Sequence, residues 1–187
     1  MRVIVTGGNS GIGKGVAAAL AADGHRVACR TIPKAEQAMR EMTGDVDVGY
    51  LDLADLSSVA AFADSVQSVD VLINNAAVFG ISLTRTVDGF EPHIGTNHLG
   101  HFALTCLLGT KVKDRVVSVV STNYGFGKLH LDDLNWHSRR FSSMAAYAES
   151  KLAIMLFINE LARRGVRAYA ANPGQAATDI TRSAPAR

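Results

Sequence analysis

The stretch Val3-Ile4-Val5-Thr6-Gly7-Gly8-Asn9-Ser10-Gly11-Ile12-Gly13 begins as a short apolar strand and continues into a glycine-rich loop that opens a helix. Gly7 permits a tight turn, and small residues later in the loop let the backbone approach a pyrophosphate and the sheet. The first turn of the following helix offers unpaired N–H groups to anionic oxygens. An ordinary turn is the alternative interpretation. We expect a dinucleotide-binding loop formed by Gly7, Asn9, Ser10, Gly11, Ile12 and Gly13.

Beyond this loop, short β-branched runs alternate with amphipathic or alanine-rich stretches of helix length. The expected strands are residues 3–5, 26–28, 46–48, 71–73, 116–120 and 166–170. The expected helices are residues 12–22, 33–42, 56–67, 91–108 and 144–163. This alternation predicts right-handed crossovers and an α/β fold, namely a Rossmann-type doubly wound parallel sheet of about six strands with helices on both faces. Ligands bind such sheets beyond the carboxyl ends of the strands.

Length and composition predict one dinucleotide-binding domain over residues 1–187. With 48% hydrophobic residues, the chain can bury a substantial core, but it is too short for two full domains. The formal net charge of +2 comes from interspersed acids and bases, so we expect no nucleic-acid partner. No apolar run approaches about 18 residues, and the N-terminus enters its glycine loop too early for a signal peptide. We therefore expect a soluble, cytoplasmic protein with no membrane partner.

Cysteine and histidine residues do not predict a metal site. Cys29 and Cys106 lie far apart in the sequence, without metal-binding spacing, and we expect two buried, reduced thiols. His93, His98 and His101 have no accompanying zinc signature. We expect no bound metal.

Tyr147 and Lys151 form the most informative pair for chemistry. They stand four residues apart at the start of an apolar helical run, so they share one face of the helix. A phenol has an ordinary pKa of about 10, and a neighbouring ammonium favours its phenolate form. The spacing is common on exposed helices, so the interpretation depends on the rest of the chain.

Taken together, six ordered motifs resemble the short-chain dehydrogenase/reductase family across essentially the whole chain. They are Thr6 to Gly13, Asn74-Asn75-Ala76, Asn97 in Thr-Asn-His-Leu-Gly-His-Phe, Ser121, Tyr147-x-x-x-Lys151, and Asn172-Pro173-Gly174. The strings from Asn97 to Phe102 and from Asp132 to Asn135 are more narrowly similar to the retinol-dehydrogenase-like and related bacterial branch.

This resemblance implies a catalytic set of four residues. Tyr147 would be the general acid in carbonyl reduction and the base in alcohol oxidation, while Lys151 would lower its pKa and bind the nicotinamide ribose. Ser121 would polarise the substrate carbonyl, with a turn-forming serine as the alternative. Asn97 would hold a proton-relay water through its side chain or an adjusted backbone, with a simple polar contact between helices as the alternative.

The resemblance also implies a cofactor site, with NADP favoured and NAD left open. Arg30 follows the second strand, where a planar cation suits the 2′-phosphate of NADP. Asp52 and Leu53 would meet the adenine, although Asp52 is alternatively a cap of the next helix. Further residues at the ribose and nicotinamide would be Asn75, Ala76, Tyr147, Lys151, Pro173, Gly174, Ala176 and Thr178.

The expected substrate is a small carbonyl or alcohol, apolar because several aromatic residues follow the strand ends. These residues, which alternatively close the core, are Phe79, Phe126, Trp136 and Phe141. The helices at 91–108 and 144–163 match those that pair across the family's interfaces, which implies a homodimer or homotetramer.

Family members usually continue past the sixth strand through a lid and a seventh strand, and we expect this chain to lack both. A shortened chain, an enzyme with an open site and a protein that is no longer catalytic are three explanations. The main prediction is an NAD(P)-dependent oxidoreductase. The alternative is a non-catalytic dinucleotide-binding or redox-sensing module with the same fold.

Overall fold

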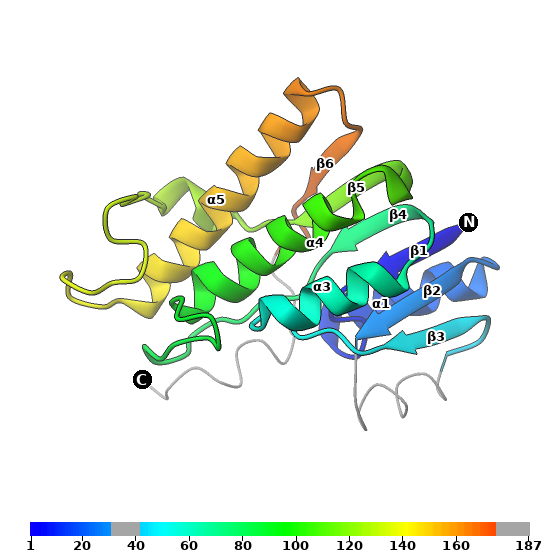
Figure 1. Ribbon diagram of the computed structural model, residues 1–187, viewed down its shortest axis with the longest axis horizontal. Coiled ribbons are helices and arrows are strands. Elements are labelled where there is room, and N and C mark those ends of the chain that lie inside the picture. The colour runs from blue at the N-terminus through cyan, green and yellow to red at the C-terminus, as the bar shows by residue number, and fades with distance from the viewer. Residues whose placement is uncertain (31–41, 175–187) are drawn as a thin grey trace.

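A six-stranded parallel sheet forms the centre of the protein (Figure 1). The computed structural model describes residues 1–30 and 42–174. The strands are β1 Arg2–Val5, β2 Arg26–Arg30, β3 Val46–Gly49, β4 Val69–Asn74, β5 Val112–Val119 and β6 Ala168–Ala171. Their order is β3-β2-β1-β4-β5-β6, and all neighbouring pairs are parallel. The doubly wound sheet is therefore confirmed, and its strand order reverses between β1 and β4.

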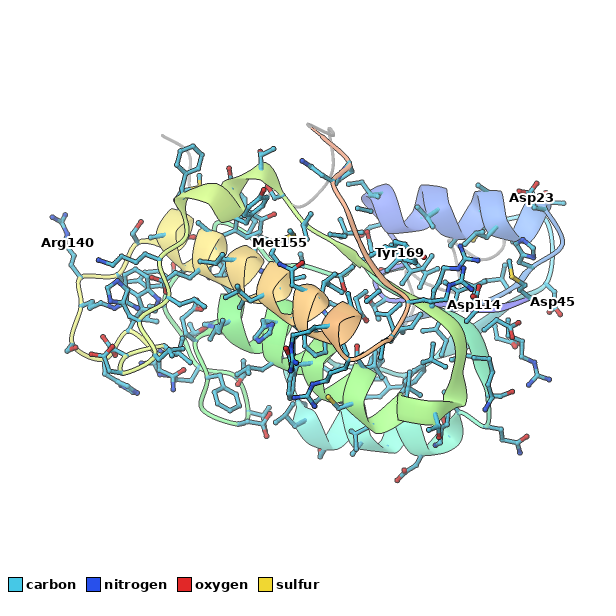
Figure 2. All side chains as sticks on the ribbon, turned by 90° about the horizontal axis from the view of Figure 1, so that it is seen from above. Asp23, Asp45, Asp114, Arg140, Met155 and Tyr169 are labelled. Atoms are coloured by element: carbon cyan, nitrogen blue, oxygen red, sulfur yellow. The ribbon has the colours of Figure 1, made fainter. Side chains whose placement is uncertain are left out.

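Helices cover both faces of this sheet (Figures 1 and 2). Helix α1, Gly11–Ala22, packs on one face, where Ala17 and Ala21 contact β1 in a small core cluster. The larger core cluster lies on the opposite face, under α3 Leu56–Ser65, α4 Gly100–Leu108 and α5 Ser143–Arg163. Except for its last residue, the helix expected over 33–42 lies outside the described residues.

Local signals fix several helix ends as the sequence indicates. Asp55 caps α3 by accepting hydrogen bonds from the backbone N–H groups of Ser57 and Ser58. Ser142 caps α5 in the same way through Ala145, and this start places Tyr147 in the second turn. Capping therefore sets where the proposed catalytic helix begins.

Several element boundaries differ from the expectation, and the largest shift among the strands is in β5. Strand β5 begins at Val112 rather than at residue 116, because the polar run Lys113-Asp114-Arg115 masks an apolar pattern. Asp114 accepts hydrogen bonds from Arg115 and Arg167, which satisfies its charge at this end of the sheet.

The predicted helix at 91–108 is divided into two parts. Residues His93–Leu99 form the π-helix η1, and only Gly100–Leu108 form the α-helix α4. At the junction, a Cβ on Gly100 would lie 2.4 Å from the carbonyl oxygen of Leu53, so close packing favours glycine there. Such π-helical turns are rare and often occur at functional sites. Asn97 lies within this one.

The surface of α4 corrects one further prediction. Cys106 is free and exposed, so the expectation of a buried thiol is wrong at this position, and the side chain of Cys29 is not described. None of the helices in the described part of the chain is both long enough and apolar enough to cross a membrane.

Candidate active site

The loop between β1 and α1 lies directly against the end of β4. Gly7 and Gly11 have φ angles of 68° and 51°, which favour glycine. A Cβ on Gly13 would lie 2.3 Å from both the carbonyl oxygen of Gly7 and Nδ2 of Asn75. The loop is therefore shaped by backbone that leaves no room for side chains on its inner side, as the expected phosphate loop requires.

Thr6 connects this loop to β4. Its Oγ1 accepts hydrogen bonds from the backbone N–H groups of Asn75 at 2.9 Å and Ala76 at 3.0 Å. The side-chain amide of Asn75 donates to the carbonyl oxygen of Thr6 at 2.9 Å. These bonds join the ends of β1 and β4 at the point where the strand order reverses, which is the expected position of a ligand.

Ser121, Tyr147 and Lys151 come together beyond the end of β5. Ser121 follows β5, opens the short helix η3 Thr122–Phe126, and its side chain acts on the pKa of the Tyr147 phenol. The ammonium of Lys151 lies 5.5 Å from the centre of the Tyr147 ring and donates to the carbonyl oxygen of Val119 at 3.0 Å. Both Tyr147 and Lys151 are buried. The structure therefore brings three of the four predicted catalytic residues into one cluster.

Burial shifts both ionisable groups of this cluster toward their neutral forms. It lowers the pKa of Lys151 to about 8 and raises the pKa of Tyr147, while the side chain of Ser121 acts to lower the pKa of Tyr147. The expectation that Lys151 lowers the pKa of Tyr147 is thus not met in this structure. Desolvation is the dominant effect on the phenol.

Asn97, the fourth predicted residue, is fully buried in η1 and belongs to a separate network. Its Oδ1 accepts from the backbone N–H of Val78 at 2.8 Å, and its Nδ2 donates to Val78 O at 3.0 Å and to Ser150 Oγ at 3.1 Å. The side chain therefore joins the segment after β4 to α5. Its contact on α5 is the residue directly before Lys151, and a role of Asn97 in holding a relay water stays a prediction.

Aromatic residues surround the Tyr147 ring. Phe79 lies edge to face with it at 4.8 Å between ring centres, and His93 lies at 6.4 Å. Phe141 contacts His93 at 6.4 Å and Trp136 at 5.5 Å. Phe126, in contrast, is 84% exposed and takes no part in this group.

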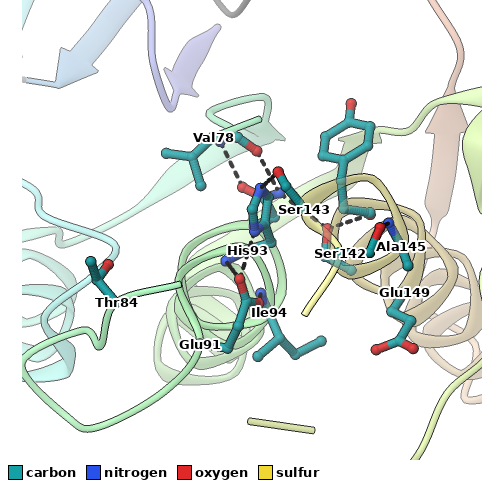
Figure 3. A network of polar contacts seen from close by, with 12 residues as sticks. Val78, Thr84, Glu91, His93, Ile94, Ser142, Ser143, Ala145 and Glu149 are labelled. Atoms are coloured by element: carbon teal, nitrogen blue, oxygen red, sulfur yellow. Dashed lines mark hydrogen bonds and ion pairs between the residues drawn. The ribbon is translucent and has the colours of Figure 1, made fainter. Parts of the chain in front are cut away.

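Phe79, His93, Trp136 and Phe141 together form an aromatic wall next to Tyr147. A buried Glu91–His93 pair supports this wall (Figure 3). His93 Nδ1 hydrogen-bonds Glu91 Oε1 at 2.6 Å, and both side chains are fully buried. Glu91 also accepts from the backbone N–H groups of His93 and Ile94, so it holds the first turn of η1. On the other side, His93 Nε2 lies 3.4 Å from Oγ of Ser143 at the start of α5.

A second polar cluster fixes the loop before α5. Asp133 accepts hydrogen bonds from the backbone N–H groups of His137, Ser138 and Arg139, which lower the pKa of its carboxyl well below the usual range. Arg139 donates to Glu149 of α5 at 2.8 Å and lies 3.8 Å above the Trp136 ring. The loop that carries the aromatic wall is thereby attached to the helix that carries Tyr147.

The remaining predicted cofactor residues are placed only in part. Arg30 ends β2, and its side chain is not described. Asp52 accepts from the backbone N–H of Ala54, while Asp55 is the N-cap of α3, so the alternative that Asp52 caps this helix is wrong. Leu53 is a core residue. Pro173 and Gly174 follow β6, whereas Ala176 and Thr178 lie outside the described residues. Within residues 1–30 and 42–174, no three acidic, histidine or cysteine side chains form a metal-binding group.

Comparisons with known proteins agree with this geometry. The sequence model of the short chain dehydrogenase family matches residues 1–187. Retinol dehydrogenase 13 from Homo sapiens is 44% identical over 96% of this chain and 60% of its own length. Retinol dehydrogenase 12 from Mus musculus is also 44% identical, over 97% of this chain and 63% of its own length. The chain thus spans about three fifths of the length of these relatives.

Solved structures share the fold. An uncharacterised protein from Mycobacterium paratuberculosis is 49% identical with a TM-score of 0.89, covering 98% of this chain and 71% of that one. A short chain dehydrogenase from Burkholderia cenocepacia, solved in complex with NADP, is 26% identical with a TM-score of 0.74. That match covers 96% of this chain and 76% of the other.

Proposed function

Because the chain belongs to the short-chain dehydrogenase/reductase family, we propose that it is an NADP-dependent oxidoreductase acting on a carbonyl or alcohol. The observation that carries this proposal is the cluster formed beyond the end of β5 by the buried Tyr147 and Lys151 with the partly exposed Ser121. The cluster lies at the same edge of the sheet as the glycine loop, where the fold binds its ligands.

The residues present fit a dinucleotide. A side chain at Gly13 would fill the space between the loop and Asn75, and α1 begins at Gly11 with its N-terminus toward the same edge. Backbone N–H groups in this position suit a pyrophosphate. The cofactor, when bound, supplies or accepts the hydride. Asn75, Ala76 and Lys151 would hold its ribose and nicotinamide.

The protein itself supplies proton transfer and charge stabilisation. Tyr147 donates its phenolic proton to the carbonyl oxygen as an alcohol forms, and it accepts a proton from the alcohol in the reverse direction. The Ser121 hydroxyl donates a hydrogen bond to the same oxygen and stabilises its developing negative charge. Burial raises the pKa of Tyr147, so the phenol carries its proton at neutral pH, which is the form that carbonyl reduction requires.

We propose an apolar substrate. Phe79 and His93 lie beside the Tyr147 ring, and Phe141 packs against His93, so aromatic side chains gather next to the phenol. The names of the relatives include retinol, a long apolar alcohol. Retinal, which is the corresponding aldehyde, and shorter aldehydes that carry an aromatic ring are therefore the first carbonyls to test.

The decisive measurement is NADPH oxidation with this panel of carbonyls, comparing the wild type with Tyr147→Phe. Loss of the phenol should reduce kcat by about 10²- to 10⁴-fold. NADPH binding should remain, since the phenyl ring keeps its contact with Phe79. Tyr169→Phe, on the half-exposed surface of β6, is the matched control and should leave turnover unchanged. NADPH binding without turnover of any carbonyl by either protein would support a non-catalytic module instead.

The choice of NADP over NAD rests on Arg30 at the end of β2. Wild-type protein should bind NADPH more tightly than NADH, and Arg30→Ala should remove most of that difference. Equal affinities that do not change in the variant would overturn the assignment. A cytoplasmic location and a homodimer or homotetramer stay predictions, and sedimentation velocity would decide the second.

A further inference from the structure

His101 is buried between the glycine loop and η1, and both of its ring nitrogens have partners. Nδ1 lies 2.9 Å from the carbonyl oxygen of Asn97, and Nε2 lies 2.8 Å from Oγ1 of Thr6. The ring is 4% exposed. One side chain therefore spans from the first residue after β1 to the π-helical turn.

The direction of each hydrogen bond in the series that joins Asn97, His101 and Thr6 follows from the partners of His101. A carbonyl oxygen only accepts, so Nδ1 of His101 must carry the proton that is donated to Asn97. Burial lowers the pKa of His101 to about 4, so at neutral pH the ring has one N–H and Nε2 is an acceptor. The hydroxyl of Thr6 must then donate to Nε2.

Thr6 completes the chain toward the cofactor side. With its proton directed to His101, its Oγ1 accepts from the backbone N–H groups of Asn75 and Ala76. The competing acceptor for the hydroxyl proton is the carbonyl oxygen of Ile73, at the longer distance of 3.5 Å. Aligned hydrogen bonds of this kind strengthen one another. The positions of Asn75 and Ala76 and that of the Asn97 backbone are thus connected by one continuous series.

We propose that His101 is a positioning residue, which fixes the end of β4 relative to the turn that carries Asn97 by donating to Asn97 and accepting from Thr6. The inference rests on the proposed function, because these two segments form the cofactor side and the catalytic side of the same site. Under this proposal, His101 belongs to the site although it contacts neither substrate nor cofactor.

The test compares His101→Phe with His101→Gln. Phenylalanine fills the space without polar atoms, whereas the amide N and O of glutamine have about the same separation as the two ring nitrogens. We expect His101→Phe to reduce kcat/KM for NADPH about 10-fold, corresponding to the loss of a buried hydrogen-bond link. His101→Gln should recover most of this loss. Equal losses in both variants, or none in His101→Phe, would overturn the proposal.

The other end of the link provides an independent variant. Thr6→Val removes the hydroxyl with little change in shape, and Thr6→Ser retains it. Combining Thr6→Val with His101→Phe should cause little more loss than Thr6→Val alone, because both break one series. If His101→Phe does not fold, a Thr6→Val protein with wild-type kinetics would still refute the link.

A readout without turnover separates this proposal from the proposed function. In ¹⁵N NMR spectra of the protein without cofactor, His101 should show a protonated Nδ1 and an unprotonated, hydrogen-bonded Nε2. The amide signals of Asn75 and Ala76 should shift in His101→Phe and return toward their original positions in His101→Gln. Protonation at Nε2, or unchanged amide signals, would overturn the proposal even if the protein proves to be an active reductase.

Discussion

The glycine loop after β1 and the first half of α5 face the same end of the sheet, but they are held in different ways. In the loop, Gly7, Gly11 and Gly13 allow backbone to pack against backbone. In α5, every residue from 146 to 151 is buried, including the ionisable side chains of Tyr147, Glu149 and Lys151. One region depends on the absence of side chains, and the other depends on buried polar ones.

This difference has consequences for stability. Small residues in a tight loop are sensitive to added volume, whereas a buried charge lowers stability unless its partners are complete. Glu149 has Arg139 as a partner, while Lys151 has only a backbone carbonyl oxygen among the hydrogen bonds described for it. Four variants or conditions test the comparison.

The largest effect is expected at Arg139. Arg139→Met leaves Glu149, which is buried, and Asp133 without their cation, so the free energy of unfolding should fall by about 4 kcal/mol. Urea denaturation followed by circular dichroism measures this change. Arg163→Met removes an exposed ion pair with Glu160 and should change stability far less. Similar losses in both variants would contradict the importance of burial.

At Gly13, an added methyl group should reduce stability by about 3 kcal/mol, because it meets Gly7 O and Asn75 Nδ2. The variant should also lose NADPH affinity, measured by the change in cofactor fluorescence. Gly15, one half-turn further along α1, has no atom within 4 Å of the point where a Cβ would lie. Gly15→Ala should therefore be neutral or slightly stabilising, and a similar loss there would mean that helix conformation rather than contact explains Gly13.

Acidification should weaken the protein through His101. Its pKa is about 4 in the folded protein and about 6.5 when unfolded, so between these values the unfolded chain binds the extra proton. As pH falls from 6.5 to 4, wild-type stability should decrease by about 2 to 3 kcal/mol relative to His101→Gln, which does not titrate. Denaturation curves of both proteins across this range provide the measurement, and parallel pH profiles would exclude the effect.

The smallest effect concerns Lys151, where the variant is expected to be more stable than the wild type. The pKa of Lys151 falls from 10.5 to about 8 on folding, so burial of the charged form opposes folding at pH 7 and is relieved between pH 8 and 10. Lys151→Met should therefore gain about 1 kcal/mol at pH 7 after loss of the bond to Val119, although turnover should be lost. The gain should shrink as pH rises toward 10. A variant less stable than wild type at pH 7 would show that the hydrogen bond outweighs desolvation.

Much of the fold and the catalytic cluster could be predicted, because their signals are local in sequence. The strand before Gly7, the spacing of Tyr147 and Lys151, and the alternation of strands and helices each report on one element. The π-helix could not be predicted, since it depends on Glu91 binding the first turn and on Gly100 meeting Leu53 from a distant segment.

Buried polar partners could not be predicted for the same reason. Arg139 and Glu149 have the pattern of ordinary surface charges, and nothing in the spacing of Thr6 and His101 shows that folding joins them across 95 positions. The apolar sequence around Cys106 predicts a buried thiol, yet this residue lies on the outer face of its helix. Sequence periodicity identifies elements, whereas the pairing of side chains requires their arrangement in space.

The central position of β1 also has a consequence for folding kinetics. Val3 pairs with Val27 on one side and with Val71 on the other, and the sheet has no antiparallel hairpin among its six strands. Loop closure must therefore precede every strand pairing, which makes folding slow compared with proteins of local topology. During synthesis on the ribosome, the second edge of β1 can be paired only after β4 has emerged. The glycine loop precedes β4 in the sequence, but its contacts with Asn75 can form only after that event.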